Sequence, residues 1–584
     1  MVSIPEAANL VPLMFQAQAK GRSQLQYIDR NKETQKQDSY KWASQWTEKA
    51  YPNPPKFGDA TSTKTYEIQW RFVTNGGQFE GIIFPALGAF GLPFYPGISM
   101  KGAFCQACTE EQKQRYRLNK NGEEPSLLRF HGGYPINDWT QNLVDIVHPQ
   151  QNWQVKTHDT HERPKGETGF ALISLLQPTI KFGISSLLLE TDWEEIWAIW
   201  EKALGYGIGC RTSSGYGMPK QRLKESGEVD YPIPIQGEVL YKAWLKGQGQ
   251  APSLIDKTLE FRPNIFRASL RGHALRIFGG LTNSSSADKL VENLFGGVED
   301  GGTQGLLTCA FQASSLKPGR FTKGYGEPTY EVAGELRWLL MAPRQLDETN
   351  KEVLKRLLKA LMKFAMLFGG FGKSWRRVDH RLFPYEYEKH RGQIENYYDN
   401  QKPLIGCHWQ WDNKSLGNAV RVRGLNQVAP FINEVRQIAS EWMRLNRVEP
   451  NENHYSDWRE AWHPENVQIW GRRADGKDSE AIQWLHQPYQ QASREFREVE
   501  KSIKGSSVTG FIKNKISQIG RLWHRMYPVV ILVDDPNNQG KKIPRMTSNY
   551  LEILTIFPDD SSECEHFLNF LRSNPGDFKR LWPT

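Results

Sequence analysis

The sequence has 584 residues, more than one hydrophobic core usually accommodates, so two or more domains are expected. Hydrophobic residues make up 39% and charged residues 24%, which excludes a fibrous or disordered chain, and a net charge of +9 permits a polyanionic partner without requiring one. With six cysteines, no signal-peptide pattern and no apolar run long enough for a membrane span, a reducing cytoplasm is the expected location.

The first half predicts an ordered series of elements. A strand over Thr65–Thr74 is followed by a helix near 101–112, which opens at Ser99-Met-Lys101-Gly102 and contains Cys105 and Cys108. Because no second Cys or His pair follows at zinc-site spacing, these two cysteines are expected to pack rather than bind metal.

A second strand and helix complete this half. A strand over Thr179–Leu189 precedes a predicted capping box, Thr191 with Glu194, and a helix whose apolar stripe includes Trp193, Trp197 and Trp200. These tryptophans are expected in the core, and Gly205 ends the helix.

The second half repeats the order. A strand over Gly237–Leu245 precedes Ser269-Leu-Arg271-Gly272, and a strand over Val332–Met341 precedes a capping box at Thr349 and Glu352. An apolar stripe from Leu354 to Phe368 then predicts a helix that stops at Gly369.

The two halves therefore form a degenerate tandem repeat. Ser99 and Ser269 lie 170 residues apart, and Gly205 and Gly369 lie 164 residues apart. The order of elements predicts an α+β fold of two tandem ferredoxin-like domains, similar to RNA recognition motifs, with a large insertion.

Four segments are expected on this basis. Residues 1–230 form the first domain with an N-terminal extension and a thumb-like insertion near 109–168, and residues 231–383 form the second core. Residues 384–500 have few sustained apolar periods and are expected to be a polar insertion. Residues 501–584, with apolar runs at Val529–Val533 and Tyr550–Phe557, are expected to complete the second sheet.

The repeated elements suit phosphate binding. A helix N-terminus offers N–H groups and a partial positive charge, and glycine-rich turns offer bare N–H groups. An ordinary capped helix and an ordinary tight turn are the alternatives, and duplication of the serine-containing tetrapeptide favours phosphate contact.

The motifs YPGISMKGAF and GIGCRTSSGYG resemble the RAMP superfamily, the repeat-associated proteins that form the backbone of CRISPR effectors. The first half is most similar to the subunit that closes the 3′ end of the crRNA in the type III-B (Cmr) complex, and EFRPNIFRASLRGHALRIFGGL resembles another Cmr subunit. A fused pair looks like the multidomain chains of type III-D variants.

The resemblance implies a crRNA-binding backbone subunit whose partners are crRNA, target RNA and other type III effector subunits, with no membrane. The residues expected to contact RNA are Ser99, Lys101, Gly102, Arg211, Ser213, Tyr216, Ser269, Arg271, Gly272, Arg276, Lys373, Ser374, Arg376, Arg377, Arg521 and Arg525.

The sequence leaves open whether the chain cleaves RNA. Relatives that cut target RNA use an Asp between the first strand and the helix, which places a candidate at Asp256, with Mg²⁺ as the cofactor if cleavage occurs and no tightly bound cofactor otherwise. A solvated loop residue is the alternative for Asp256. A second function is metal-independent processing of precursor crRNA by histidines, for which the candidates are His131, His148, His158, His161 and His524. A glycan-binding or scaffold protein would explain the aromatic residues but not the repeated tetrapeptide.

Overall fold

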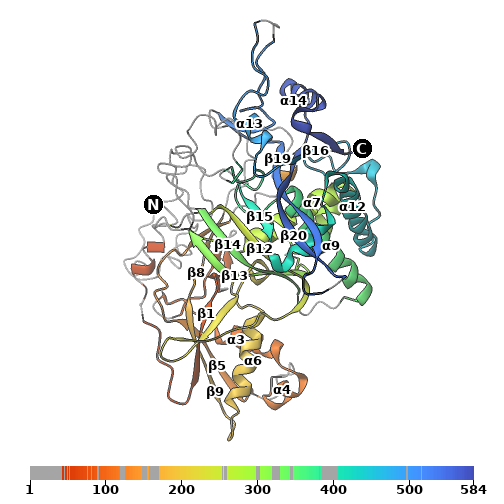
Figure 1. The fold of residues 1–584 in the computed structure, drawn as a ribbon. Helices are drawn as coiled ribbons and strands as arrows, with labels where there is room; N and C mark the ends of the chain where they lie inside the picture. Colours follow the sequence, from red (N-terminus) through yellow and green to blue (C-terminus); the bar gives the residue numbers. More distant parts are fainter. Residues whose placement is uncertain are drawn as a thin grey trace. The chain divides into compact units, whose positions relative to one another are not determined.

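The computed structural model consists of two compact units, residues 1–149 with 165–238 and residues 150–164 with 239–584. It describes residues 43–584 except 45, 49, 51–52, 75–76, 80–81, 89–90, 119–124, 148–153, 157–169, 253, 255–258, 298–302, 319–328, 342–345, 381, 384–405, 495–497, 514–515 and 539. The expected N-terminal extension lies mostly outside these residues. Figure 1 shows the helices and strands of both units.

The first unit contains a ferredoxin-like sheet. In chain order its elements are β1 (Ser62–Ile68), α3 (Gly97–Ala107), β5 (Leu128–Pro135), β9 (Thr179–Ser186), α6 (Trp193–Gly205) and β10 (Pro219–Leu223). The strands lie in the order β11-β10-β1-β9-β5, with β11 (Val229–Pro232) added at the edge, and neighbouring strands are antiparallel. This is the βαββαβ arrangement that the sequence predicted.

Helix α6 has the apolar stripe and the N-terminal cap that favour a helix. Trp197, Trp200 and Leu204 are buried on one face, as the apolar stripe predicted. The helix begins one residue later than the predicted capping box, because the Asp192 side chain, not Thr191, accepts a hydrogen bond from the Glu195 N–H at 3.0 Å.

The stretch near 109–168, which was expected to be a thumb-like insertion, contributes to the first sheet instead. This stretch supplies α4 (Glu110–Arg115) and then β5, which is an integral strand of the first sheet. Among the described residues of this stretch, β6 (Val144–Val147), paired with β7 (Phe170–Ile173), forms a separate ribbon. The short strands of this unit are β2 (Arg71–Phe72) with β8 (Leu175–Leu176) and β3 (Gly77–Phe79) with β4 (Ile82–Phe84).

The second unit begins with another sheet of the same topology. Its elements are β12 (Glu238–Gln250), α7 (Asn264–Gly279), α8 (Ser284–Phe295), β13 (Leu307–Pro318), β14 (Thr329–Leu340), α9 (Glu348–Phe368) and β15 (His408–Trp411). The strand order is β13-β14-β12-β15, so the first and second sheets have equivalent strand orders.

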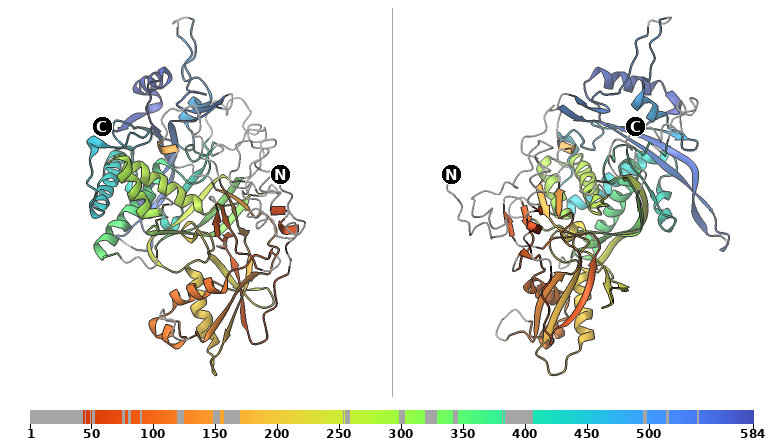
Figure 2. Two further views of the ribbon diagram at one scale, coloured as in Figure 1. Left: turned by 180° about the vertical axis from the view of Figure 1, so that it is seen from behind. Right: turned by 90° about the vertical axis from the view of Figure 1, so that its left-hand side faces the viewer.

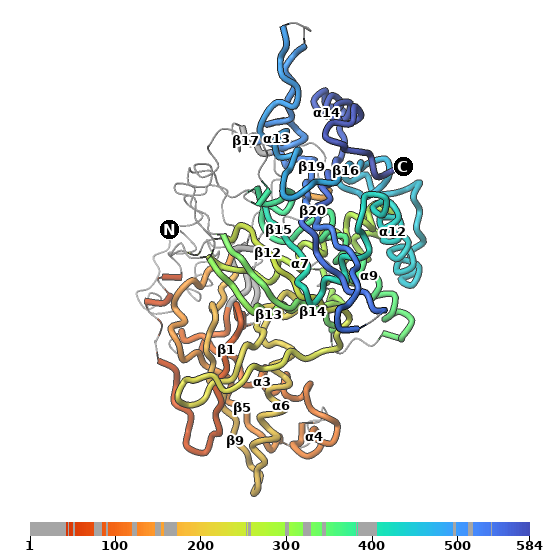
Figure 3. The backbone as a smooth tube through the Cα atoms, in the orientation of Figure 1, coloured from red at the N-terminus to blue at the C-terminus, as the bar shows by residue number. Residues whose placement is uncertain are grey.

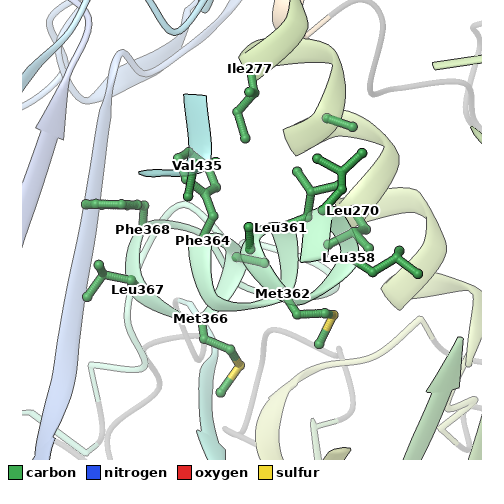
Figure 4. Packing of buried hydrophobic residues seen from close by; sticks show 14 of the residues in the cluster. Leu270, Ile277, Leu358, Leu361, Met362, Phe364, Met366, Leu367, Phe368 and Val435 are labelled. Atoms are coloured by element: carbon green, nitrogen blue, oxygen red, sulfur yellow. The ribbon is translucent and has the colours of Figure 1, made fainter. Parts of the chain in front are cut away.

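The core of this unit forms around α9. Leu358, Leu361 and Phe368 lie on the buried stripe that the sequence predicted, and Phe364 is buried beside them (Figure 4). The N-cap is Asp347, whose carboxylate accepts from the Asn350 N–H at 2.8 Å, and not the expected Thr349.

A third sheet follows that the sequence did not predict. It contains β16 (Gln468–Ala474), α13 (Glu480–His486), β19 (Leu522–Asp534), β20 (Lys542–Ile556), α14 (Ser562–Arg572) and β21 (Lys579–Trp582). The order β19-β20-β16-β21 with antiparallel pairs is again ferredoxin-like. Strands β19 and β20 form a long ribbon, coloured blue in Figures 2 and 3.

The C-terminal segment therefore does not complete the second sheet as expected, because β15 occupies that edge. The expected polar insertion also contains ordered elements: β15, β16, α13 and α12 (Val428–Leu445), which buries Phe431, Val435 and Trp442. The remaining elements are β17 (Gly510–Lys513), β18 (Ile516–Ile519) and the short 3₁₀ helices Thr212–Ser214, Asn413–Arg421, Leu425–Gln427, Glu452–His454 and Pro575–Asp577.

All six cysteines are free thiols. Cys108 is buried and Cys105 packs against the same core of the first unit. Burial raises the pKa of the Cys108 thiol to about 12, with Cys105 as a second cause. Among the described residues, no helix is long and apolar enough to cross a membrane.

Candidate nucleic-acid interface

The first turn of α3 packs against the β5 backbone at Gly97 and is exposed at Ile98 and Ser99. Gly97 is the first helical residue and Pro96 the N-cap, which has no side chain to accept from the first N–H groups. Ser99 is exposed as the third helical residue and so is not the cap that the sequence suggested. Lys101 is half-buried and Gly102 is exposed, with nothing within 4 Å of where its Cβ would lie. A phosphodiester can therefore approach this turn closely.

The glycine-rich loop after α6 has backbone angles that its glycines permit. Gly207, Gly209, Gly215 and Gly217 all have positive φ, and a side chain at Gly209 or Gly217 would clash with the carbonyl oxygens of Val73 or Ile208. Between them, Arg211 is left-handed (φ 59°) and Ser213 lies in the 3₁₀ turn Thr212–Ser214, both half-buried.

Tyr95 brings this loop and the start of α3 together. Its hydroxyl donates to the Ser99 carbonyl oxygen at 3.2 Å, and its ring lies 5.8 Å from that of Phe72. The Cys210 N–H donates to the Val73 carbonyl oxygen at 2.8 Å, which holds the loop beside Phe72. Burial, with the nearby Cys210, raises the pKa of Tyr95 above its ordinary value. Two elements far apart in sequence thus lie around one buried tyrosine.

Tyr216 does not belong to this exposed surface. It is 1% exposed, its ring lies 4.4 Å from that of Trp70, and its hydroxyl donates to Asp145. The expectation that Tyr216 contacts RNA is wrong because its ring and hydroxyl are used inside the core.

The second serine-containing tetrapeptide is placed differently from the first. Helix α7 begins at Asn264, so Ser269 is the sixth helical residue, and it is buried together with Gly272. Arg271 donates to the Gly296 carbonyl oxygen at 2.8 Å, at the C-terminal end of α8. This tetrapeptide stabilises a helix end within the fold, so its expected role in phosphate binding is not supported.

Of the four RNA contacts predicted in the second glycine cluster, Lys373 and Ser374 are exposed. The Ser374 hydroxyl donates to the Gln250 side chain at 2.9 Å. Arg377 turns inward and donates to the carbonyl oxygens of Leu522 and Thr509.

Arg276 and Arg376 belong to a buried ion cluster centred on Glu460. The Glu460 carboxylate is fully buried and accepts from Arg276 at 2.6 Å, from Arg376 at 2.6 Å and from Arg459 at 2.7 Å. Burial raises the pKa of Glu460, but the three guanidinium groups outweigh burial and hold it below its usual value. These predicted RNA contacts are structural.

The RNA contacts predicted at Arg525, on β19, and at Arg521, just before β19, are also buried. Arg521 pairs with Asp559 at 3.1 Å, and Arg525 donates to the Cys407 carbonyl oxygen at 3.4 Å. His524 is 0% exposed and bonded to Glu552 at 3.0 Å, so it cannot reach RNA as an acid–base catalyst. Of the other histidines in that alternative, His131 is exposed and bonded to Ser185 at 2.8 Å, and His148, His158 and His161 lie outside the described residues.

A groove of about 260 Å³ lies on the face of the second sheet that α7 and α9 do not cover. Its lining mixes polar and apolar residues from all four strands: Lys246, Gly247, Gln248, Ser315, Lys317, Glu331, Val332, Ala333, His408 and Gln410. Lys246 pairs with Asp412 at 2.8 Å. The groove was not foreseen, because its residues lie far apart in sequence.

Asp256, the candidate for cleavage, lies outside the described residues. Within the described part of the chain, no group of three or more His, Cys, Asp or Glu side chains is arranged to hold a metal ion.

No family model and no curated protein matches the sequence. Among solved structures, the chain is similar to the crystal structure of Cmr1 from Pyrococcus furiosus in its apo form. The TM-score is 0.29 at 10% sequence identity, and the match covers 58% of this chain and 98% of Cmr1.

Proposed function

We propose that the chain is an RNA-binding backbone subunit of a type III CRISPR effector, and that its first unit holds the phosphates of a guide RNA. The observation that carries the proposal is the convergence of the α3 start and the glycine-rich loop around Tyr95. The motif resemblance described above falls on the same two segments.

The chemistry of this surface suits a sugar–phosphate chain. The uncapped first turn of α3 provides N–H groups and the positive end of the helix dipole. Lys101 adds a full charge, and Gly102 leaves room for a backbone to approach. Arg211, Thr212 and Ser213 provide a cation and hydroxyl groups from the loop. None of these contacts reads a base, so binding through them is independent of sequence.

Sequencing the RNA that co-purifies with the chain from cells carrying a CRISPR array tests this function. The expected RNA has one size class with a shared repeat-derived end and variable spacer sequence. RNA of random size and origin, or no RNA, would overturn the proposal. A Lys101→Ala variant is expected to retain less RNA. Lys224→Ala is the control, because Lys224 is an exposed lysine of the same unit in the turn between β10 and β11, and this variant is expected to retain the wild-type amount.

A further inference from the structure

The first sheet has one face that its helices leave uncovered. Along β9, Ile180, Phe182 and Ile184 are buried beneath α3 and α6, whereas Lys181 and Ser185 alternate with them and are only half-buried. Figure 1 shows α3 and α6 on one side of β1, β5 and β9. Thr65 and Tyr134 are the cross-strand partners of Lys181, so they share the uncovered face.

Three aromatic rings gather on this face. Phe94 is stacked on Tyr134 with ring centres 5.7 Å apart and planes 15° apart, and Phe57 meets Tyr134 edge-on at 5.9 Å. All three side chains are half-buried, so part of each ring surface meets solvent. Gly183 lies below Phe57, and a Cβ there would come within 2.5 Å of the Phe57 ring. We call Phe57, Phe94 and Tyr134 the aromatic platform.

Two cations, Lys181 and Arg129, lie on the same face of the sheet as the aromatic platform. Lys181 lies beside Tyr134, and Arg129 is exposed on the same face of β5. The carboxylate on this face of the described strands is Glu67, which already accepts from Lys220 at 3.1 Å and from Gln221 at 2.5 Å. Stacked rings with excess cations match a chain of bases and phosphates better than an apolar partner.

The aromatic platform and the start of α3 are linked through neighbouring residues of the chain. Phe94 directly precedes Tyr95, which is hydrogen-bonded to the Ser99 carbonyl oxygen. A strand whose phosphates lie at α3 therefore has its neighbouring nucleotides within reach of Phe94 and Tyr134.

We propose that bases of single-stranded RNA stack on the aromatic platform, while Lys181 and Arg129 contact the flanking phosphates. The inference rests on the proposed function and adds a base-binding surface to it. Duplex RNA is excluded as the ligand because its bases are already stacked on one another.

The test compares two labelled oligomers of about 16 nucleotides, an oligouridylate and its abasic counterpart. Tyr134→Leu combined with Phe94→Leu is expected to weaken oligouridylate binding about tenfold and to leave abasic binding unchanged. Tyr134→Phe keeps the ring and is expected to bind like wild type. Trp193→Leu, a matched loss of a half-buried ring on the helix-covered side, is expected to have no effect.

A second readout does not depend on the variants. An oligomer carrying 2-aminopurine loses fluorescence when its base stacks, so quenching on binding to the wild-type chain is expected. Equal losses on both oligomers, or no quenching, would overturn the stacking proposal. If the double variant changes neither affinity while Lys101→Ala weakens both, stacking fails and the proposed function stands. If the wild-type chain binds neither oligomer, both fail.

Discussion

The Tyr95 hydroxyl donates a hydrogen bond to the Ser99 carbonyl oxygen at 3.2 Å, and the Tyr95 ring lies 5.8 Å from that of Phe72, beside which the glycine-rich loop is held. The first turn of α3 and the loop are therefore connected through buried rings rather than through the solvent-exposed residues themselves.

Tyr95→Phe removes this hydrogen bond and retains the ring. We expect the free energy of unfolding to fall by about 1 kcal/mol and RNA binding to weaken, because the first turn of α3 loses a constraint. Tyr66→Phe removes a hydrogen bond elsewhere in the same unit, from Tyr66 to the Glu201 carboxylate at 3.0 Å. Urea denaturation should show that both variants are destabilised, Tyr66→Phe at least as much because its bond is to a charged group, and only Tyr95→Phe should weaken RNA binding. Equal RNA affinity for the two variants would contradict this role of Tyr95.

Glu460→Gln tests the buried ion cluster. The substitution leaves Arg276, Arg376 and Arg459 without their shared carboxylate, and we expect a loss of about 3–5 kcal/mol in the free energy of unfolding. The midpoint of urea denaturation measures the loss.

Glu449→Gln is the matched control. Glu449 is largely exposed and lies 3.5 Å from Arg444, so its loss should cost less than about 0.5 kcal/mol. Equal shifts of the two midpoints would show that the Glu460 cluster does not stabilise the fold.

Buried histidines predict acid sensitivity. Burial lowers the pKa of His273, with Arg276 and Arg525 as further causes, and burial lowers that of His380, next to His486. Both histidines therefore stay neutral in the folded chain, whereas the unfolded chain binds protons below about pH 6.5. Stability is retained above that pH and falls on acidification by at most about 1.4 kcal/mol per pH unit for each histidine.

Urea denaturation between about pH 7 and about pH 5 measures this slope. His273→Met removes one titrating group of similar volume and is expected to make the slope shallower. An unchanged slope for His273→Met would contradict the prediction.

Much of the first two sheets could be predicted because their local patterns match their environments. The stripes of α6 and α9 face the core, and the strands before them were placed within a few residues. The caps moved by one or two residues because Asp192 and Asp347 compete with the neighbouring threonines for the same N–H groups.

The repeated tetrapeptide misled because a short motif does not reveal where its helix begins. Gly97 starts α3 two residues before Ser99, whereas α7 starts five residues before Ser269, so the serine and the glycine are exposed in the first copy and buried in the second. The inward arginines could not be recognised either, since Glu460 lies 84 residues beyond Arg376 in sequence.

The third sheet and the aromatic platform were missed for related reasons. Strands β16 and β21 are short and far apart in sequence, so no period marks them as partners. Tyr134 lies on β5, in the stretch for which the sequence predicts a thumb-like insertion. Its neighbours Phe57 and Phe94 come from loops.

The most direct test of RNA binding at α3 is the dependence of oligouridylate affinity on salt for Lys101→Ala, Arg271→Ala and Lys224→Ala. If Lys101 contacts one phosphate, its loss reduces the slope of log affinity against log salt by about 0.7, and the other two variants keep the wild-type slope. A wild-type slope for Lys101→Ala, together with a reduced slope for Arg271→Ala, would place the phosphates elsewhere and contradict the proposed interface.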